Sequence, residues 1–88
     1  MMWTIEFDER AQRDLAKLDK PVAKRIRRFL EDRVAPLDNP RAFGKPLKHG
    51  LAGKGRYRVG DYRILCKIED NKLIVLVIEI GHRSSVYD

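Results

Sequence analysis

The amino-acid sequence predicts a small α+β domain in which an N-terminal strand and a helical hairpin pack on an antiparallel β-meander. Residues 3–7 alternate apolar and polar side chains, the pattern of a strand with one buried face. Apolar residues then recur at helical spacing between residues 11 and 34, and a strand pattern returns from residue 56. With 88 residues the chain is expected to form one domain, residues 1–88, around a single two-layer core.

Two helices are predicted after the first strand, each with its own start signal. Asp8 can cap the first helix, whose apolar repeat is Ala11, Leu15 and Leu18. Asp19 and Pro21 restart the chain, Asp19 as a cap and Pro21 as a residue that the first helical turn tolerates. The buried stripe of the second helix is Val22, Ile26, Phe29, Leu30 and Val34. The connection is so short that the helices must be neighbours.

Residues 36–55 are predicted to form a long loop, because prolines and glycines interrupt any periodic pattern there. A loop of this length in a compact domain is commonly functional. Its basic residues are Lys45, Lys48, His49 and Lys54.

The remaining pattern predicts a three-stranded meander joined by two short turns. Gly60-Asp61 suits a two-residue hairpin turn, because glycine takes a positive φ freely, and Asp70-Asn71 is the second expected turn. The third strand begins with a continuous apolar run, which is typical of a buried strand. The strands are expected at residues 56–59, 62–69 and 73–80.

The turn at Gly60-Asp61 sets a register that places Arg58 directly opposite Arg63. Like charges at this separation, about 4.5–5.5 Å between Cβ atoms, destabilise a sheet. An anion held between the two guanidiniums would turn repulsion into attraction, and a phosphate suits their forked donors. The alternative is that both side chains simply extend into water.

One open face of the predicted sheet collects both polar and apolar groups. Six side chains are expected to converge there as candidate catalytic groups: Arg56, Arg58, Arg63, His82, Arg83 and Tyr87. An apolar patch is expected beside them, formed by Ile74, Leu76, Ile78 and Ile80. Uncovered apolar surface of this kind usually marks a protein interface, and an amphipathic, acidic partner segment would suit both groups. The alternative is that the long loop covers the third strand.

The charge balance favours an anionic partner. The 19 Lys and Arg residues against 13 Asp and Glu residues give a net charge of +6. A membrane surface is disfavoured because the basic helix lacks an aromatic-rich apolar face, and no apolar run could span a bilayer. With no signal-peptide pattern, and with a single cysteine, Cys66, that excludes an internal disulfide, the protein is expected in the cytoplasm. Two histidines and one cysteine, far apart, predict no metal site.

Two stretches of the chain resemble a known family: Arg56-Tyr57-Arg58-Val59-Gly60-Asp61-Tyr62-Arg63-Ile64 and Gly81-His82-Arg83-Ser84-Ser85-Val86-Tyr87. In this order and spacing, the sequence resembles the RelE side of the RelE/ParE superfamily of bacterial toxin–antitoxin modules, over essentially its whole length. The resemblance implies a small RelE-like domain that acts as an mRNA endoribonuclease in the A site of the 70S ribosome. It also implies a RelB-like antitoxin that wraps and blocks the toxin, with operator DNA contacted only through that antitoxin.

The resemblance also implies which residues form the site: Arg56, Arg58, Arg63, Arg83 and Tyr87. The well-studied members have lysines where this chain has Arg56 and Arg58, so the charge is kept but the acid–base options change. His82 stands where the family often has histidine or lysine. It is either an acid or base with a suitable intrinsic pKa or a surface residue that flanks the site.

The implied reaction is attack of an RNA 2′-hydroxyl on its own phosphate, which gives a cyclic phosphate and a free 5′-hydroxyl without a metal or other cofactor. Arg58 and Arg63 are candidates for clamping the phosphate, and Arg56 for binding the same oxygens or a flanking phosphate. Tyr87 is the candidate base, or a stacking group, and Arg83 would stabilise the leaving oxygen.

Further candidate RNA contacts lie outside this group: Lys45, Lys48, Lys54, Arg25 and Arg28. The simpler interpretation of the two helical arginines is a solvated helix face. Two other functions stay open on the sequence. The chain could inhibit DNA gyrase without nuclease chemistry, or it could be a catalytically idle homologue that acts with its antitoxin as a repressor.

Overall fold

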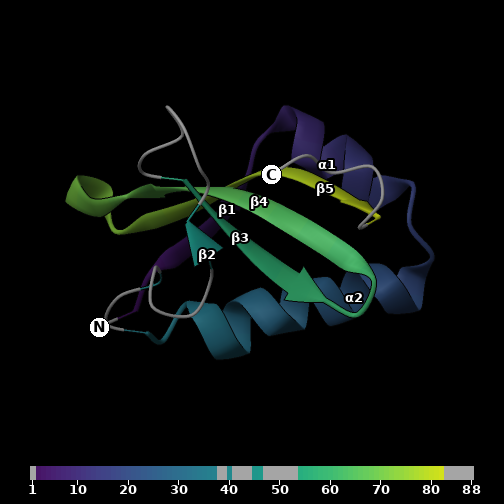
Figure 1. The fold of residues 1–88 in the computed structure, drawn as a ribbon, viewed down its shortest axis with the longest axis horizontal. Coiled ribbons are helices and arrows are strands. Elements are labelled where there is room, and N and C mark those ends of the chain that lie inside the picture. The colour runs from purple at the N-terminus through teal and green to yellow at the C-terminus, as the bar shows by residue number, and fades with distance from the viewer. Residues whose placement is uncertain (1, 38–39, 41–44, 47–53, 83–88) are drawn as a thin grey trace.

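The computed structural model describes residues 2–37, 40, 45–46 and 54–82 of the chain. Its elements follow the predicted order, with a strand and two helices before the remaining strands (Figure 1). They are β1 (Thr4–Phe7), α1 (Glu9–Ala16), α2 (Lys20–Phe29), a π-helical turn (Leu30–Val34), β2 (Lys45–Pro46), β3 (Lys54–Val59), β4 (Tyr62–Glu69), a 3-10 turn (Asp70–Lys72) and β5 (Ile74–His82).

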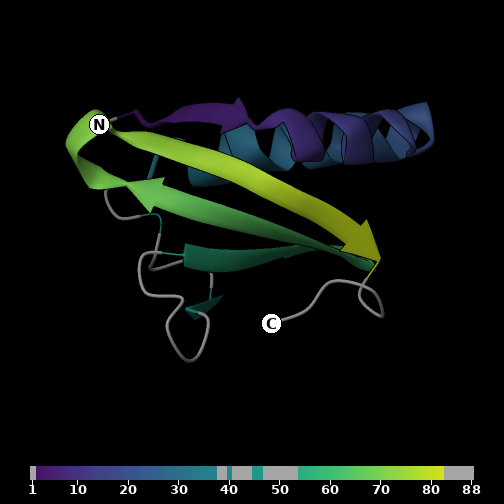
Figure 2. The same ribbon diagram turned by 90° about the horizontal axis from the view of Figure 1, so that it is seen from above.

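The strands form one mixed sheet in the order β1-β5-β4-β3-β2. β1 runs parallel to β5, whereas β2, β3, β4 and β5 pair antiparallel in succession. Both helices lie on one face of the sheet, as Figure 2 shows from above. Figure 1 looks onto the other side, which we call the open face. The α+β class, with a helical hairpin packed on an antiparallel meander, is therefore confirmed.

The two helices begin where the sequence predicts, but their caps differ. The side chain of Asp8 accepts a hydrogen bond from the Ala11 amide at 2.9 Å, so Asp8 is a true N-cap. Asp19 occupies the N-cap position of α2, where its side chain makes no capping bond, and Pro21 lies in the first turn. No helix in the described part of the chain is both long and apolar enough to cross a membrane.

The core lies between the helices and the sheet. Ile26, Leu30 and Val34 are almost fully buried, as the predicted stripe requires, and they belong to one cluster with side chains from β3, β4 and β5. Tyr57 is 3% exposed, and its hydroxyl donates to the Pro40 carbonyl oxygen at 2.7 Å. This bond ties the segment after the helices to β3, because a buried tyrosine hydroxyl needs a partner.

The turn before β5 is longer than predicted. A 3-10 turn over Asp70–Lys72 is followed by Leu73 with a φ of 54°, so that Glu69 pairs with Ile74 and the expected two-residue turn at Asp70-Asn71 is wrong. This change moves the register by two residues. A shift of two keeps every side chain on its expected face, because strand alternation has a period of two.

A bulge further along β5 does change the faces. Pairing passes from Cys66 with Val77 to Leu65 with Glu79, which leaves Ile78 as one extra residue on β5. Residues after the bulge therefore face the opposite way from the prediction. Ile80 is 4% exposed and lies in the core, so its expected place on the open face is wrong.

Candidate active site

Three arginines from two neighbouring strands share the open face. Arg58 on β3 pairs directly with Arg63 on β4, and Arg56 pairs with Leu65, which confirms the predicted register of this hairpin. The register follows from the turn, where Gly60 has a φ of 59°, a conformation that residues with a Cβ rarely adopt. Because alternate residues of a strand share a face, all three arginines lie on the side away from the helices.

The charges of these arginines act on one another. The pKa of Arg56 is lowered from its ordinary value, first by burial and then by the positive charges of Arg63 and Arg58. Its Nη1 atom is shielded from solvent, which agrees with the effect of burial. Arginine nevertheless stays protonated in proteins. The three residues therefore form a fixed patch of positive charge, the arginine cluster, that a bound anion would stabilise.

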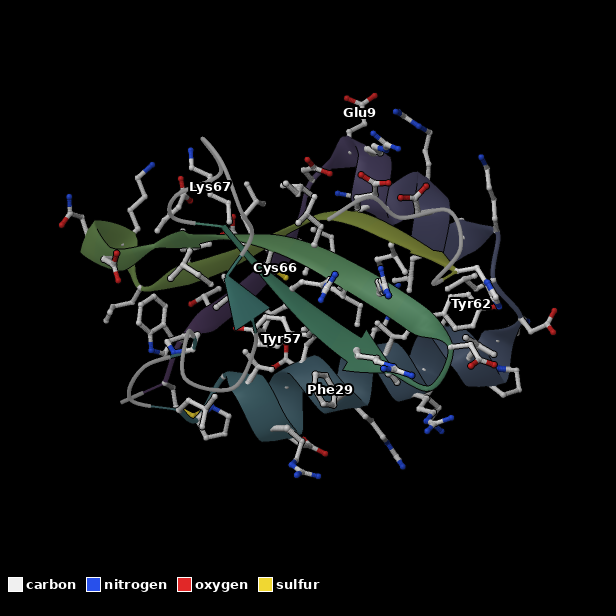
Figure 3. All side chains as sticks on the ribbon, in the orientation of Figure 1. Glu9, Phe29, Tyr57, Tyr62, Cys66 and Lys67 are labelled. Atoms are coloured by element: carbon white, nitrogen blue, oxygen red, sulfur yellow. The ribbon has the colours of Figure 1, made fainter. Side chains whose placement is uncertain are left out.

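The backbone register brings lysines to the same part of the sheet. Lys45 on β2 pairs with Arg56, and Lys54 pairs with Lys67 on β4. Lys67 is exposed, whereas its neighbour Cys66 is buried beneath the sheet (Figure 3). Sequence reasoning missed β2, because two residues inside a segment rich in proline and glycine carry no periodic signal. The backbone pairing therefore places Lys45 and Lys54 at positions next to the strands that carry the arginine cluster and Lys67.

His82 does not join the arginine cluster. It pairs with Tyr62, and the two rings make an edge-to-face contact with 5.8 Å between centroids. Tyr62 lies two residues before the core residue Ile64 and therefore shares its face of the sheet. His82, as the partner of Tyr62, lies on this helix side as well. The expectation that His82 shares the open face with Arg58 is wrong, and the bulge at Ile78 is the reason.

Not all of the predicted site residues are among those that the structure describes. Arg83, Tyr87 and Lys48 lie outside the described residues, as do the side chains of Lys45 and Lys54. The last described residues still fix where this segment starts. Gly81 pairs with Arg63, so Arg83 follows two residues after the position opposite Arg63.

The open face also carries apolar side chains. Ile74, Leu76 and Ile78 on β5 are each partly buried, as is Leu65 on β4, and we call these four residues the apolar strip. The strip borders the arginine cluster, because Leu65 is the partner of Arg56. Three of the four predicted antitoxin contacts thus keep their expected face.

On the helix layer, Arg25 and Arg28 are exposed on α2. No group of three or more His, Cys, Asp or Glu side chains within the described ranges is arranged to hold a metal ion. The arrangement as a whole can bind an anion with two or more oxygens, since guanidiniums donate in parallel pairs. None of the three clustered arginines can act as a base.

Comparison with known proteins gives consistent matches over nearly the whole chain. Residues 5–87 match the family model for the ParE toxin of the type II toxin–antitoxin system, parDE. The chain is 33% identical over 87 residues to the toxin RelG of Mycobacterium tuberculosis, an alignment that covers 99% of this chain and 98% of that protein. It is also 33% identical over 91 residues to the mRNA interferase toxin RelE of Escherichia coli, covering 99% and 92%.

A solved structure shares the fold. A chain of the toxin–antitoxin complex RelBE2 of Mycobacterium tuberculosis superposes with a TM-score of 0.84 at 32% identity, covering 97% of this chain and 95% of that chain.

Proposed function

Because the chain belongs to the ParE toxin family of type II toxin–antitoxin systems, as a RelE-type toxin, we propose that it is an endoribonuclease that cleaves mRNA in the ribosomal A site. The related toxin of Escherichia coli is named an mRNA interferase. The observation that carries the proposal for this chain is the directly opposed pair of Arg58 and Arg63, with Arg56 beside it. Ribosomes and mRNA are cytoplasmic, so the toxin would act there.

The reaction we propose is an internal transfer at phosphorus. The 2′-oxygen of one nucleotide forms a bond to the adjacent phosphorus, the bond from phosphorus to the 5′-oxygen of the next nucleotide breaks, and a 2′,3′-cyclic phosphate remains. Arg58 and Arg63 would hold the non-bridging oxygens, where charge develops in the transition state, and Arg56 would bind the same oxygens or a flanking phosphate. Their fixed charge supplies the electrostatic stabilisation without a metal.

Two protons must also move. The 2′-hydroxyl loses one and the leaving 5′-oxygen gains one, and the arginine cluster cannot accept the first. Tyr87 is the proposed base, and Arg83 the proposed partner of the leaving oxygen. Arg83 follows closely on Gly81, the partner of Arg63. His82, on the helix side, is proposed only as a flanking group.

The partner proposed for the open face is a RelB-like antitoxin. The apolar strip and the arginine cluster border each other, so an amphipathic, acidic segment could cover both at once. Operator DNA would be reached only through this antitoxin. Ile80 is not part of the proposed interface, because it is buried in the core.

Contacts to RNA outside the arginine cluster are proposed for the basic residues around the site. Lys45, Lys48, Lys54, Arg25 and Arg28 would bind RNA phosphates, which position the toxin without reading sequence. The proposed site lies on one face of a small sheet, on the side away from the helices. We therefore propose that the ribosome orients the mRNA and that free RNA is cut weakly or not at all.

The test is cleavage of mRNA on purified ribosomes, with the 5′ ends mapped. The wild type should cut at the A-site codon, and Arg63→Ala should lose about a hundredfold or more of the rate, as removal of one transition-state donor does elsewhere. Arg83→Ala and Tyr87→Phe should lose activity strongly, and His82→Gln less. If the mRNA stays intact on ribosomes incubated with the wild-type protein, the nuclease proposal is wrong.

A second candidate is inhibition of DNA gyrase, because the matching family model is that of ParE toxins. The same proteins decide between the two functions in a DNA supercoiling assay with purified gyrase. Inhibition of supercoiling that survives Arg63→Ala, together with intact mRNA, would favour this candidate.

A further inference from the structure

A groove of about 440 Å³ lies between α2 and the β3–β4 hairpin, away from the apolar strip. Its apolar floor is formed by Phe29 on α2 and Val59 on β3. The ring of Phe29 is itself held by an edge-to-face contact with Tyr57, with 6.2 Å between centroids. The other lining residues are polar or belong to the turn: Arg25, Arg28, Asp32, Arg33, Arg58 and Gly60.

One arginine spans the groove from the helix to the hairpin. A Cβ placed on Gly60 would lie 3.3 Å from Nη1 of Arg25, so the guanidinium of this α2 residue rests against the β3–β4 turn. The absence of a side chain at Gly60 makes room for it. The groove is thus bounded by a charged group that comes from the helix layer and reaches the sheet layer.

The positive charge of the groove indicates that its ligand is an anion. Four guanidiniums line it against one carboxylate, that of Asp32. Within the described part of the chain, neither Arg25 nor Arg28 forms an ion pair with a carboxylate. Guanidiniums at this density favour a ligand with several phosphates, because each binds oxygens through forked donors.

Arg58 connects the groove to the proposed site of cleavage. It lines the groove and also pairs with Arg63 on the open face. A polymer with regularly spaced phosphates could therefore bind the arginine cluster with one phosphate and the groove with the next ones. An acidic peptide fits less well, because the apolar surface that would anchor its side chains is limited to the floor.

We propose that this groove binds the single-stranded RNA backbone next to the scissile phosphate, with Arg25 and Arg28 as phosphate-binding residues. The inference rests on the proposed nuclease function and adds a path to it: the RNA would leave the open face around the β3 edge and continue onto α2. Such contacts fix position and supply affinity, and they carry no base specificity.

The experiment compares two variants that each lose two positive charges. Arg25→Gln with Arg28→Gln removes charge from the groove, whereas Lys17→Gln with Lys20→Gln removes exposed charge from the junction of α1 and α2. The probe is a short single-stranded RNA with 2′-O-methyl groups, which cannot be cleaved. Its dissociation constant is measured by fluorescence anisotropy at salt concentrations from about 50 to 200 mM.

The groove variant should flatten the plot of log affinity against log salt by about 1.4, since each lost phosphate contact contributes about 0.7 for a single strand. The lysine variant should change the slope far less. Arg28→Gln alone should give about half of the effect, which guards against disturbance of the turn by loss of Arg25. Equal slopes for the groove and lysine variants would overturn the inference.

The same variants separate the other outcomes. If the groove variant instead loses affinity for the antitoxin while its RNA slope matches that of the lysine variant, the groove belongs to the antitoxin and the inference fails. If the wild type does not cleave ribosome-bound mRNA but the groove variant still flattens the salt dependence, the nuclease function fails and the RNA site stands.

Discussion

Arg58 and Arg63 occupy directly opposed positions of β3 and β4, where like charges cost a sheet about 0.2–1 kcal/mol. The pair lies on the side of the sheet away from the helices, and Arg58 itself is exposed, so a neutral residue could take its place without loss of burial. A third positive charge, on Arg56, adds to the repulsion. An anion bound between the side chains would replace this repulsion by attraction to both guanidiniums.

The destabilisation caused by the Arg58–Arg63 repulsion can be measured as a gain in stability when one of the two charges is removed. Arg58→Gln should raise the free energy of unfolding of the free toxin by about 0.2–1 kcal/mol at low ionic strength. The gain should shrink as added salt screens the repulsion. Urea unfolding at low and high salt measures both effects, with Lys17→Gln as a control for the loss of one exposed charge. Lower stability of Arg58→Gln at low salt would show that the pair does not repel.

Cys66 gives a prediction about a side chain that the fold keeps uncharged. The residue is fully buried on β4, and burial raises the pKa of its thiol well above the ordinary value. The folded protein then keeps the thiol neutral, whereas the unfolded chain ionises it above about pH 8.5. The stability contributed by this difference is complete below that pH and falls as the pH rises further, by up to about 1.4 kcal/mol per pH unit.

Urea unfolding from about pH 7 to pH 10 tests this effect of Cys66. The difference in stability between the wild type and Cys66→Ala should stay constant up to about pH 8.5 and then narrow. Iodoacetamide should leave the thiol of the folded protein unmodified at pH 8 and label it in urea. Rapid labelling of the folded protein would contradict the burial of Cys66.

At the scale of elements, the sequence predicted those features that have a local chemical signal. Gly60 marks the β3–β4 turn because that position needs a positive φ, and the Arg58–Arg63 pair follows from it. The turn before β5 also contains a residue with a positive φ, but this residue is Leu73. Leucine rarely adopts a positive φ, so the sequence does not indicate this turn. Ile78 at the bulge simply continues the apolar run that starts at Leu73, so nothing in the sequence pattern marks it as an extra residue.

These two misses had different consequences for the candidate site. The longer turn moved the register by two residues and left the apolar strip on its expected face. The bulge moved Ile80 into the core and placed His82 beside Tyr62. Periodicity predicts the face of each side chain only while the strand alternates without interruption, which is why the wrong faces begin after the bulge at Ile78.

Helix α1 lies beside the β5 edge beyond the point where β1 ends. Phe7 pairs with Val77, and beyond this point the β5 edge is bordered by α1. The amide of Ile80 donates to Oδ2 of Asp14 at 3.0 Å, and Arg10 forms an ion pair with Glu79 at 3.2 Å. The carboxylate thus supplies the acceptor that a neighbouring strand would give to the backbone of β5.

Removal of this acceptor should destabilise the end of β5. Asp14→Ala is expected to lower the free energy of unfolding by about 1–3 kcal/mol, because it leaves the amide of the buried Ile80 without its partner. Asp14→Asn keeps an oxygen that can accept and should cost less. Urea unfolding gives both values, and faster hydrogen exchange at the Ile80 amide should accompany the loss. Equal stability of Asp14→Ala and the wild type would show that water replaces the carboxylate.

At the scale of the whole molecule, two surfaces border each other on the side of the sheet that the helices do not cover. The arginine cluster spans β3 and β4, and the apolar strip spans β4 and β5. These three strands lie side by side in the sheet (Figure 1). Their shared border at Leu65 and Arg56 means that a partner seated on the strip would also crowd the cluster. Neutralisation by the antitoxin would then follow from occupancy of the open face, and no change of shape in the toxin is needed.

This arrangement predicts that antitoxin binding and RNA cleavage can be separated by one substitution in the strip. Leu76→Asp places a carboxylate in the middle of the apolar strip and opposite Lys67, whose charge helps the free toxin to tolerate it. Affinity for the antitoxin should fall at least tenfold, about 1.4 kcal/mol, whereas cleavage on the ribosome should change little, because Leu76 is not part of the arginine cluster. Met2→Asp is the matched control, since Met2 is a large apolar residue that is 63% exposed. Calorimetric titration of both variants with the antitoxin decides the matter, and equal affinities for the two would place the antitoxin elsewhere on the toxin.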